Sequence, residues 1–256
     1  MIQLNYKSFG QGPPLIIVHG LFGTLDNWQT IAKQFSTSYS VFLIDQRNHG
    51  RSPHVDGLFN YKILAEDLKE FMEQNWIYKA SLIGHSMGGK TILQFAAEYP
   101  EMIDKMVVVD IGPKIYEGGH EIVLEALAAV PIETLADRQQ AEQILWSKIG
   151  EMGTVQFLLK NLSRKKEGGF EWKMNLKNLV ENYSNILAAI EKSEPCMVET
   201  LFIRGGRSNY ITESDYPLLL QQYPNSTVAT IEDAGHWVHA DKPQELYTLA
   251  SQFLNK

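Results

Sequence analysis

The chain has 256 residues, of which 44% are hydrophobic and 21% charged, and its 23 Lys plus Arg against 30 Asp plus Glu give a formal net charge of −7. This is the composition of a globular protein with one large domain, or one domain with an insertion, and it excludes wholesale disorder. The acidic balance argues against nucleic acid as a partner, because a surface that binds polyphosphate needs an excess of basic residues.

Neither export nor membrane insertion is indicated by the sequence. Residues Met1–Gly10 alternate apolar and polar side chains and lack a basic region followed by an apolar one, so they predict a first strand. No apolar run approaches the ~18 residues needed to cross a bilayer. The single cysteine, Cys196, cannot form an internal disulfide. We therefore expect a cytoplasmic protein, monomer or homodimer, with no membrane partner.

Short apolar runs alternate with amphipathic segments of helical length along most of the chain. The expected strands are Leu15–His19, Tyr39–Asp45, Lys79–Gly84, Ile103–Asp110, Val198–Arg204 and Ser226–Ile231. The expected helices between them are Tyr61–Asn75, Thr91–Tyr99, Tyr216–Tyr223 and Pro243–Leu254. Because each strand is apolar through its centre, the pattern predicts an α/β fold with a mostly parallel sheet that is covered by helices on both faces.

Residues 112–195 break this alternation. They contain helical stretches without a strong strand run, namely Glu121–Val130, Arg138–Ile149, Thr154–Leu162 and Leu176–Ile190. Gly118-Gly119 and the segment Arg164–Gly169 are natural turn positions. We expect residues 1–111 and 196–256 to form the core, and residues 112–195 to form a helical cap over the loop edge of the sheet.

The segment Gly84-His85-Ser86-Met87-Gly88 follows an expected strand and opens a helix. In that context Gly-x-Ser-x-Gly predicts a nucleophile elbow, a turn so sharp that glycines are needed where a Cβ would clash. A serine hydroxyl is a weak nucleophile until a neighbouring imidazole takes its proton. The sequence therefore predicts Ser86 as a nucleophile that depends on a histidine elsewhere in the chain.

The catalytic histidine is expected in the loop after the last strand. His236 lies there, in Ala234-Gly235-His236-Trp237, five residues after Ile231. His239 follows three residues later, at the entrance to the final helix, where we expect a structural role. We therefore assign the general base to His236.

A carboxylate must orient that imidazole, and its usual location is the turn after the strand Val198–Arg204. That turn, Gly205–Tyr210, contains no carboxylate. The next carboxylates, Glu213 and Asp215, lie too far along the chain after the strand to be confident replacements. Asp110 ends the preceding strand of the sheet on the same edge as Ser86, so we assign the acid to Asp110. Ser208 then stands where the usual acid would, and we expect its hydroxyl to donate a hydrogen bond to Asp110.

Two backbone amides should stabilise a developing oxyanion. One belongs to Met87, the residue after the nucleophile, and the other to the glycine-flanked loop after the strand Leu15–His19. We expect Leu21 as the second donor, with Phe22 as the other choice. His19 is expected to be buried and to brace this loop.

These segments together resemble the α/β-hydrolase superfamily, and within it the bacterial YbfF-type esterases. The resemblance rests on HGLFG from His19, on D-x-RNHG-x-S from Asp45, on GHSMGGK from Gly84, on the strand end VDIGP at Val109 and on GHWVHA from Gly235. It implies an acid at Asp110 with an associated serine at Ser208. It also implies a helical cap and the hydrolysis of short acyl esters or acyl thioesters such as acyl-CoA, with no cofactor.

Two other chemistries remain open on the same residues. Gly84–Thr91 also satisfies the phosphate-loop pattern GxxxxGK[ST], which would make the chain a nucleotide hydrolase with Lys90 on the phosphates. Carbon–carbon bond hydrolases and lyases on this fold keep the same Ser-His-Asp set. His236, His239 and Asp241 have some metal-ligand character, but no further ligand is identified and we expect no metal.

The substrate pocket is expected to be apolar, with Phe22, Met87, Ile111 and Trp237 next to the triad in the sequence. Aromatic residues of the cap could extend this pocket, namely Trp146, Phe157, Phe170, Trp172 and Tyr183. The run Arg164-Lys165-Lys166 is either a solvated turn or a contact for a CoA phosphate. The sequence thus predicts a serine hydrolase that cleaves ester or acyl-CoA thioester bonds through an acyl-enzyme.

Overall fold

The computed structural model describes residues 2–190 and 194–256. Met1, in the expected first strand, and residues 191–193, in the expected cap, lie outside the described residues. A seven-stranded sheet runs in the order β1-β3-β2-β4-β5-β8-β9, and it is parallel apart from the pair β1 and β3. The strands are β1 (Tyr6–Phe9), β2 (Pro14–Val18), β3 (Ser40–Ile44), β4 (Ala80–His85), β5 (Ile103–Val109), β8 (Glu199–Gly205) and β9 (Ser226–Ile231). The predicted α/β fold is confirmed.

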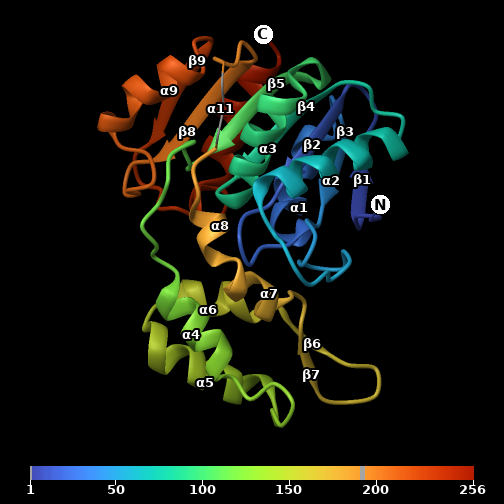
Figure 1. The fold of residues 1–256 in the computed structure, drawn as a ribbon, viewed down its shortest axis with the longest axis vertical. Coiled ribbons are helices and arrows are strands. Elements are labelled where there is room, and N and C mark those ends of the chain that lie inside the picture. The colour runs from blue at the N-terminus through green and yellow to red at the C-terminus, as the bar shows by residue number, and fades with distance from the viewer. Residues whose placement is uncertain (1, 191–193) are drawn as a thin grey trace.

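Helices cover both faces of the sheet (Figure 1). One face carries α2 (Tyr61–Gln74), α3 (Met87–Glu98) and α9 (Tyr216–Gln222), and the other carries α1 (Gln29–Phe35), α10 (Val238–Asp241) and α11 (Pro243–Leu254). Successive strand side chains point to opposite faces, so Ile16 packs with the first group and Ile17 with the second. This two-sided burial explains the continuous apolar runs. No helix among the described residues is long and apolar enough to span a membrane.

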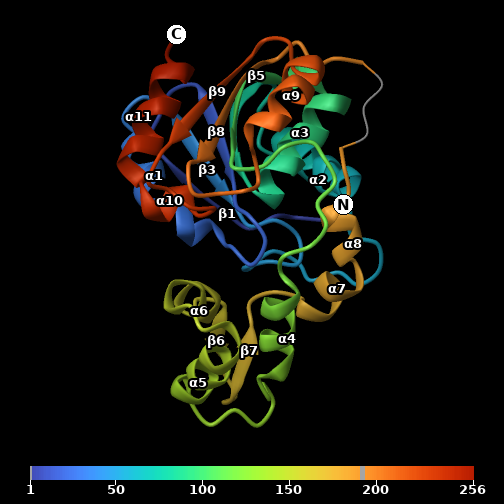
Figure 2. The same cartoon turned by 90° about the vertical axis from the view of Figure 1, so that its left-hand side faces the viewer.

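The segment between β5 and β8 forms a separate lobe beside one edge of the sheet (Figures 1 and 2). Its elements are α4 (Glu121–Ala129), α5 (Arg138–Ile149), α6 (Met152–Leu159), β6 (Leu162–Arg164), β7 (Phe170–Trp172), α7 (Leu176–Glu181) and α8 (Tyr183–Leu187). We call this lobe the cap. Helix α8 lies between the rest of the cap and the core in both views.

The insertion also contains two short strands that the sequence pattern did not predict. β6 and β7 pair as an antiparallel hairpin whose turn lies within the segment predicted as a turn, Arg164–Gly169. Strands of three residues are too short to give a detectable alternation, which is why the sequence pattern missed them. The predicted helix Leu176–Ile190 is divided at Asn182, whose backbone leaves the helical region with φ −109° and ψ 16°. The Asn182 side-chain amide donates to the carbonyl oxygens of Gly57 and Asn178.

Buried polar contacts fasten the cap to the core. The side chains of Asn48 and Asn178 share a hydrogen bond of 2.8 Å, and the backbone amide of Phe59 donates to the Asn182 side chain at 3.0 Å. A third contact comes from the cap segment between α6 and β6, where the Asn161 side chain donates to the Phe22 carbonyl at 2.7 Å. Because buried hydrogen bonds are specific in geometry, these contacts set the cap in one position over the sheet edge.

We predict that Gly88→Ala lowers the free energy of unfolding by about 1–3 kcal/mol, the usual effect of overpacking. A Cβ at Gly88 would lie 2.3 Å from the carbonyl oxygen of Val18, so α3 would have to move away from β2. Urea denaturation followed by circular dichroism measures the change. The matched control is Gly112→Ala, whose Cβ would lie 3.5 Å from its nearest neighbour, the Tyr116 hydroxyl. Equal stability of the two variants would contradict the prediction.

Candidate active site

Ser86 occupies a strained turn between β4 and α3. Its φ of 52° lies in the left-handed region, which is costly for a residue with a side chain. A Cβ at Gly84 would lie 2.4 Å from the Gly88 carbonyl oxygen, so the strand and the helix approach too closely for any side chain there. The glycines of the motif thus permit the turn that directs Ser86 away from the sheet.

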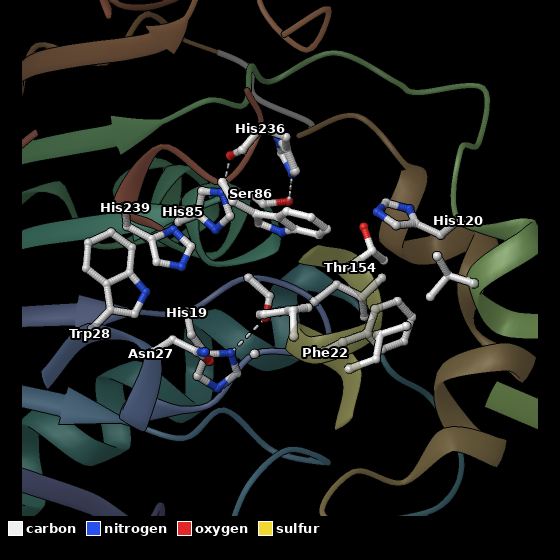
Figure 3. Close-up of a pocket in the computed structure, with 17 residues that line it drawn as sticks. His19, Phe22, Asn27, Trp28, His85, Ser86, His120, Thr154, His236 and His239 are labelled. Atoms are coloured by element: carbon white, nitrogen blue, oxygen red, sulfur yellow. Dashed lines mark hydrogen bonds between the residues drawn. The ribbon is translucent and has the colours of Figure 1, made fainter. Parts of the chain in front are cut away.

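The structure brings Ser86, His236 and Asp110 into one chain of hydrogen bonds. Ser86 Oγ and His236 Nε2 are 2.9 Å apart (Figure 3). On the other side of the ring, His236 Nδ1 donates to Asp110 Oδ2 at 2.8 Å. These residues follow β4, β9 and β5, whose carboxyl ends meet at one edge of the sheet. His239, the other candidate, instead stacks on Trp28 with ring centroids 4.7 Å apart.

Asp110 is completely buried and held on both oxygens. Its Oδ1 accepts from the Gly205 amide at 2.9 Å, and Ser208 Oγ donates to Oδ2, in the contact predicted from the sequence. The later carboxylate Asp215 lies elsewhere, paired with Lys114 at 2.8 Å. Asp110 therefore presents one oxygen in a fixed position to His236.

Two residues that sequence reasoning missed support His236. His85 Nε2 donates to the His236 carbonyl oxygen at 2.8 Å, and burial holds the pKa of His85 well below its usual value, so this ring is neutral. The ring of Tyr210 stacks on His236 with centroids 3.8 Å apart and planes 15° from parallel. His85 stands at a variable position of the elbow motif, and no sequence signal marks Tyr210.

The loop after β2 lies against Ser86. A Cβ at Gly20 would be 3.1 Å from Ser86 Cβ, so this glycine allows the close approach of the loop that carries Leu21 and Phe22. His19 Nδ1 donates to the Gly20 carbonyl oxygen at 2.8 Å, while its Nε2 accepts from the Gln46 amide at 3.0 Å. His19 is thus buried and braces the loop, as the sequence predicted.

Two cavities meet at Ser86, and each also includes Leu21 and the cap residue His120. The first cavity is lined among others by Phe22, Phe157, His236 and Trp237. The second cavity, the smaller of the two, is lined among others by Met87, Lys90, Ile111, Tyr116 and Ile186. The predicted pocket residues therefore divide into two groups on either side of the serine.

The other cap residues proposed for the pocket lie outside these two cavities. Trp146 is exposed on α5, Phe170 is buried within the cap, and Tyr183 contacts His120. The basic run from Arg164 to Lys166 lies at the turn of the β6–β7 hairpin, where Lys165 approaches Glu133 at 3.5 Å. Phe157 is the member of the predicted cap set that lines the first cavity.

His120, at the start of α4, reaches the site from the cap. Its backbone amide donates to Tyr183 Oη at 3.0 Å, and that hydroxyl lies 3.0 Å from His120 Nδ1. Burial and the nearby His236 lower the pKa of His120 to about 4, so the ring is neutral near pH 7. On the other side of the ring, Tyr210 Oη lies 3.4 Å from His120 Nε2, so both ring nitrogens have a phenolic hydroxyl as neighbour.

Comparison with known proteins gives consistent matches. A family model described as the alpha/beta hydrolase fold matches residues 13–147. Esterase YbfF of Escherichia coli is 38% identical over 94% of this chain and 93% of its own length. The sn-1-specific diacylglycerol lipase of Mus musculus is 36% identical over 94% of this chain and 81% of its own. The solved structure of a marine microorganism esterase has a TM-score of 0.96 and 38% identity, covering 99% of this chain and all of that one.

The geometry of Lys90 does not suit a phosphate loop. Lys90 lies within α3 and is almost completely buried, and its Nζ donates to the carbonyl oxygens of Leu187 and Ala188 at 3.1 and 2.5 Å. It therefore binds the end of cap helix α8. Burial lowers the pKa of Lys90 to about 7.

We predict that Lys90 makes stability depend on pH above neutrality. A lysine of the unfolded chain titrates near 10.4, so between about pH 7 and 10 the unfolded chain binds more protons than the native chain. The free energy of unfolding must then rise with pH in this window. Chemical denaturation at several pH values measures the free energy of unfolding of each protein. We expect the value for wild type minus the value for Lys90→Met to increase from pH 7 to 10. The control, exposed Lys62→Met, should show no such slope; a flat difference for Lys90 would refute the assignment.

Proposed function

Because this chain belongs to the α/β-hydrolase family, and is a carboxylic ester hydrolase of that superfamily, we propose that it cleaves short-chain esters and acyl-CoA thioesters through an acyl-enzyme on Ser86. The observation that carries the proposal is the unbroken hydrogen-bond chain from Ser86 through His236 to Asp110. An imidazole that contacts both a serine hydroxyl and a buried carboxylate is the arrangement that activates serine for acyl transfer.

In the first half of the proposed cycle, Ser86 Oγ attacks the carbonyl carbon of the substrate while His236 Nε2 takes the serine proton. The charge that develops on the carbonyl oxygen is stabilised by the Met87 amide, at the N-terminus of α3, and by the Leu21 amide. His236 then gives its proton to the leaving oxygen or sulfur. Asp110 holds Nδ1 of the imidazole throughout and stabilises the imidazolium.

In the second half, water replaces the leaving group. His236 takes a proton from this water as its oxygen attacks the acyl carbon, and it returns the proton to Ser86 as the acyl bond breaks. The carboxylic acid then leaves. Every step uses groups of this chain, so the proposed cycle needs no cofactor.

The two cavities suggest how the substrate is oriented. The leaving group must lie near His236, which lines the first cavity and protonates it. The acyl group then extends into the second cavity, against Met87 and Ile111. Because this cavity is the smaller of the two, we propose a preference for short acyl chains.

We expect substitutions of Ser86, Asp110 and Ser208 to lower the turnover of p-nitrophenyl butyrate by amounts that decrease in that order. Ser86→Ala should lower kcat by about 10⁶-fold and Asp110→Asn by about 10⁴-fold, because the latter leaves the imidazole in the wrong tautomer. Ser208→Ala, which removes one hydrogen bond to a charged acid, should lower kcat by roughly 10- to 100-fold. Asp215→Asn is the matched control, since Asp215 pairs with Lys114. Normal turnover in Asp110→Asn with loss in Asp215→Asn would overturn the assignment.

Substrate class is tested with p-nitrophenyl esters and acyl-CoA thioesters of matched chain lengths. We expect kcat/KM to be greatest for short acyl groups in both series, and Ile111→Ala, which enlarges the second cavity, to move the optimum to longer chains. Arg164→Ala should leave the thioester kcat/KM unchanged, because the hairpin turn lies outside both cavities. An optimum at long chains, or one unmoved by Ile111→Ala, would refute the proposed orientation.

A further inference from the structure

The loop after β2 contains a tight turn whose conformation is unusual for its residues. The turn runs from Gly20 to Gly23, and the Gly23 amide donates to the Gly20 carbonyl oxygen at 2.9 Å. Its third residue, Phe22, has a φ of 58°, in the left-handed region. In a four-residue turn a third residue with positive φ is usually glycine, because a side chain makes this conformation costly. Contacts from outside the turn must therefore hold Phe22 in place.

The two outer peptides of this turn are held by hydrogen bonds, whereas the central one is not. The Gly20 carbonyl oxygen accepts a second bond from His19 Nδ1 at 2.8 Å, and the Phe22 carbonyl oxygen accepts from Asn161 Nδ2 at 2.7 Å. In the part of the chain that the structure describes, the backbone amides of Leu21 and Phe22 have no hydrogen-bond acceptor. The torsion angles of the turn alone thus set the directions of these two amides.

Asn161 belongs to the cap and is itself firmly placed. It lies between α6 and β6 and is 1% exposed. Its backbone amide donates to the Leu158 carbonyl oxygen at 2.9 Å, and its carbonyl oxygen accepts from the Lys173 amide at 2.8 Å. Its buried Oδ1 has no partner among the described residues, so the bond to Phe22 is the hydrogen bond that orients this side chain there. The cap thus presents one donor to the turn in a fixed direction.

The turn lies directly against the nucleophile. A Cβ at Gly20 would be 3.1 Å from Ser86 Cβ, and Leu21 lines both cavities together with Ser86. Leu21 and Phe22 are both buried, and buried amides are rarely left without an acceptor. During acyl transfer the substrate carbonyl oxygen becomes an oxyanion next to the serine. Unpaired amides beside Ser86 are suited to bind an acceptor that forms only in the reaction.

We propose that Asn161 is a positioning residue for the oxyanion hole. The inference rests on the proposed acyl transfer at Ser86. By binding the Phe22 carbonyl oxygen, Asn161 keeps Phe22 in the left-handed region and keeps the amides of Leu21 and Phe22 directed at the substrate oxygen. Without this bond, Phe22 relaxes to a negative φ by rotation of the central peptide. That rotation turns the Phe22 amide and displaces the neighbouring Leu21 amide, so a cap residue sets the geometry of a catalytic loop of the core.

The test compares turnover with the binding of an oxyanion. Asn161→Leu and the smaller Asn161→Ala both remove the donor, and each is compared with wild type on p-nitrophenyl butyrate. We expect kcat to fall about 10- to 100-fold while KM changes less than twofold, because the lost alignment acts on the transition state. The inhibition constant of a short alkyl trifluoromethyl ketone, whose adduct with Ser86 carries an oxyanion, should rise by the same factor. A merely structural loss would lower the folded fraction and leave this inhibition constant unchanged.

A second substitution tests whether the conformation of Phe22 carries the effect. Glycine adopts positive φ without steric cost, so a turn with Phe22→Gly no longer needs the cap to enforce its shape. Adding Asn161→Leu to Phe22→Gly should therefore lower kcat less than threefold relative to Phe22→Gly alone. The matched control is Asn178→Leu. Asn178 is another buried cap asparagine, whose side chain donates to a core carbonyl oxygen, that of Gly57, at 2.8 Å.

With kcat expressed per folded molecule, as measured by circular dichroism, Asn178→Leu should match wild type in kcat and in the inhibition constant. A kcat and inhibition constant within twofold of wild type in Asn161→Leu would overturn the inference and leave the proposed function intact. So would an equal loss in Asn178→Leu, or an undiminished effect of Asn161→Leu in the Phe22→Gly background. Failure of wild type to hydrolyse the ester or to bind the ketone would overturn the proposed function as well.

Discussion

The close approach of β2, β4 and α3 around Ser86 is the constraint on which the rest of the site depends. Gly84 and Gly88 have no room for a Cβ, because backbone carbonyl oxygens of the neighbouring elements lie within 2.4 Å of where it would stand. The turn forces Ser86 to a φ of 52°, and Phe22 and Asp110, which follow the neighbouring strands, also have positive φ. Strain of this kind persists only where the surrounding structure enforces it. Here the buried parallel sheet supplies that enforcement at three adjacent strand ends.

The His236 imidazole is held by a carboxylate at the end of β5, although the usual place for that carboxylate is the turn after β8. Asp110 follows β5, and the end of β8 and the loop after it contribute the Gly205 amide and the Ser208 hydroxyl that hold it. The loop that lacks an acid thus provides the donors that orient one. Tyr210, two residues after Ser208, covers the face of His236, so the same loop also fixes the plane of the imidazole ring.

The cap takes part in the site as well as covering it. Asn161 holds the carbonyl of Phe22, His120 stands between the two cavities, and Lys90 binds the end of α8 from the core side. Each contact is polar and buried, so each requires a defined geometry. The cap position, the shape of the two cavities and the conformation of the loop around Phe22 are therefore coupled.

The sequence by itself determined the core strands, the sharp turn at Ser86, and the placement of Ser86, His236 and Asp110 after three strands whose carboxyl ends share one edge, because these follow from local patterns. Only the tertiary structure decided the β6–β7 hairpin, the division of the pocket into two cavities and the contacts of His85, His120 and Tyr210. It alone also brought Trp28 and His239, 211 positions apart in the numbering, into one stack. The physical reason is that a strand, a cap or a sharp turn leaves a periodic or compositional trace in consecutive residues. A contact between distant loops depends on how whole elements pack, and no local pattern records it.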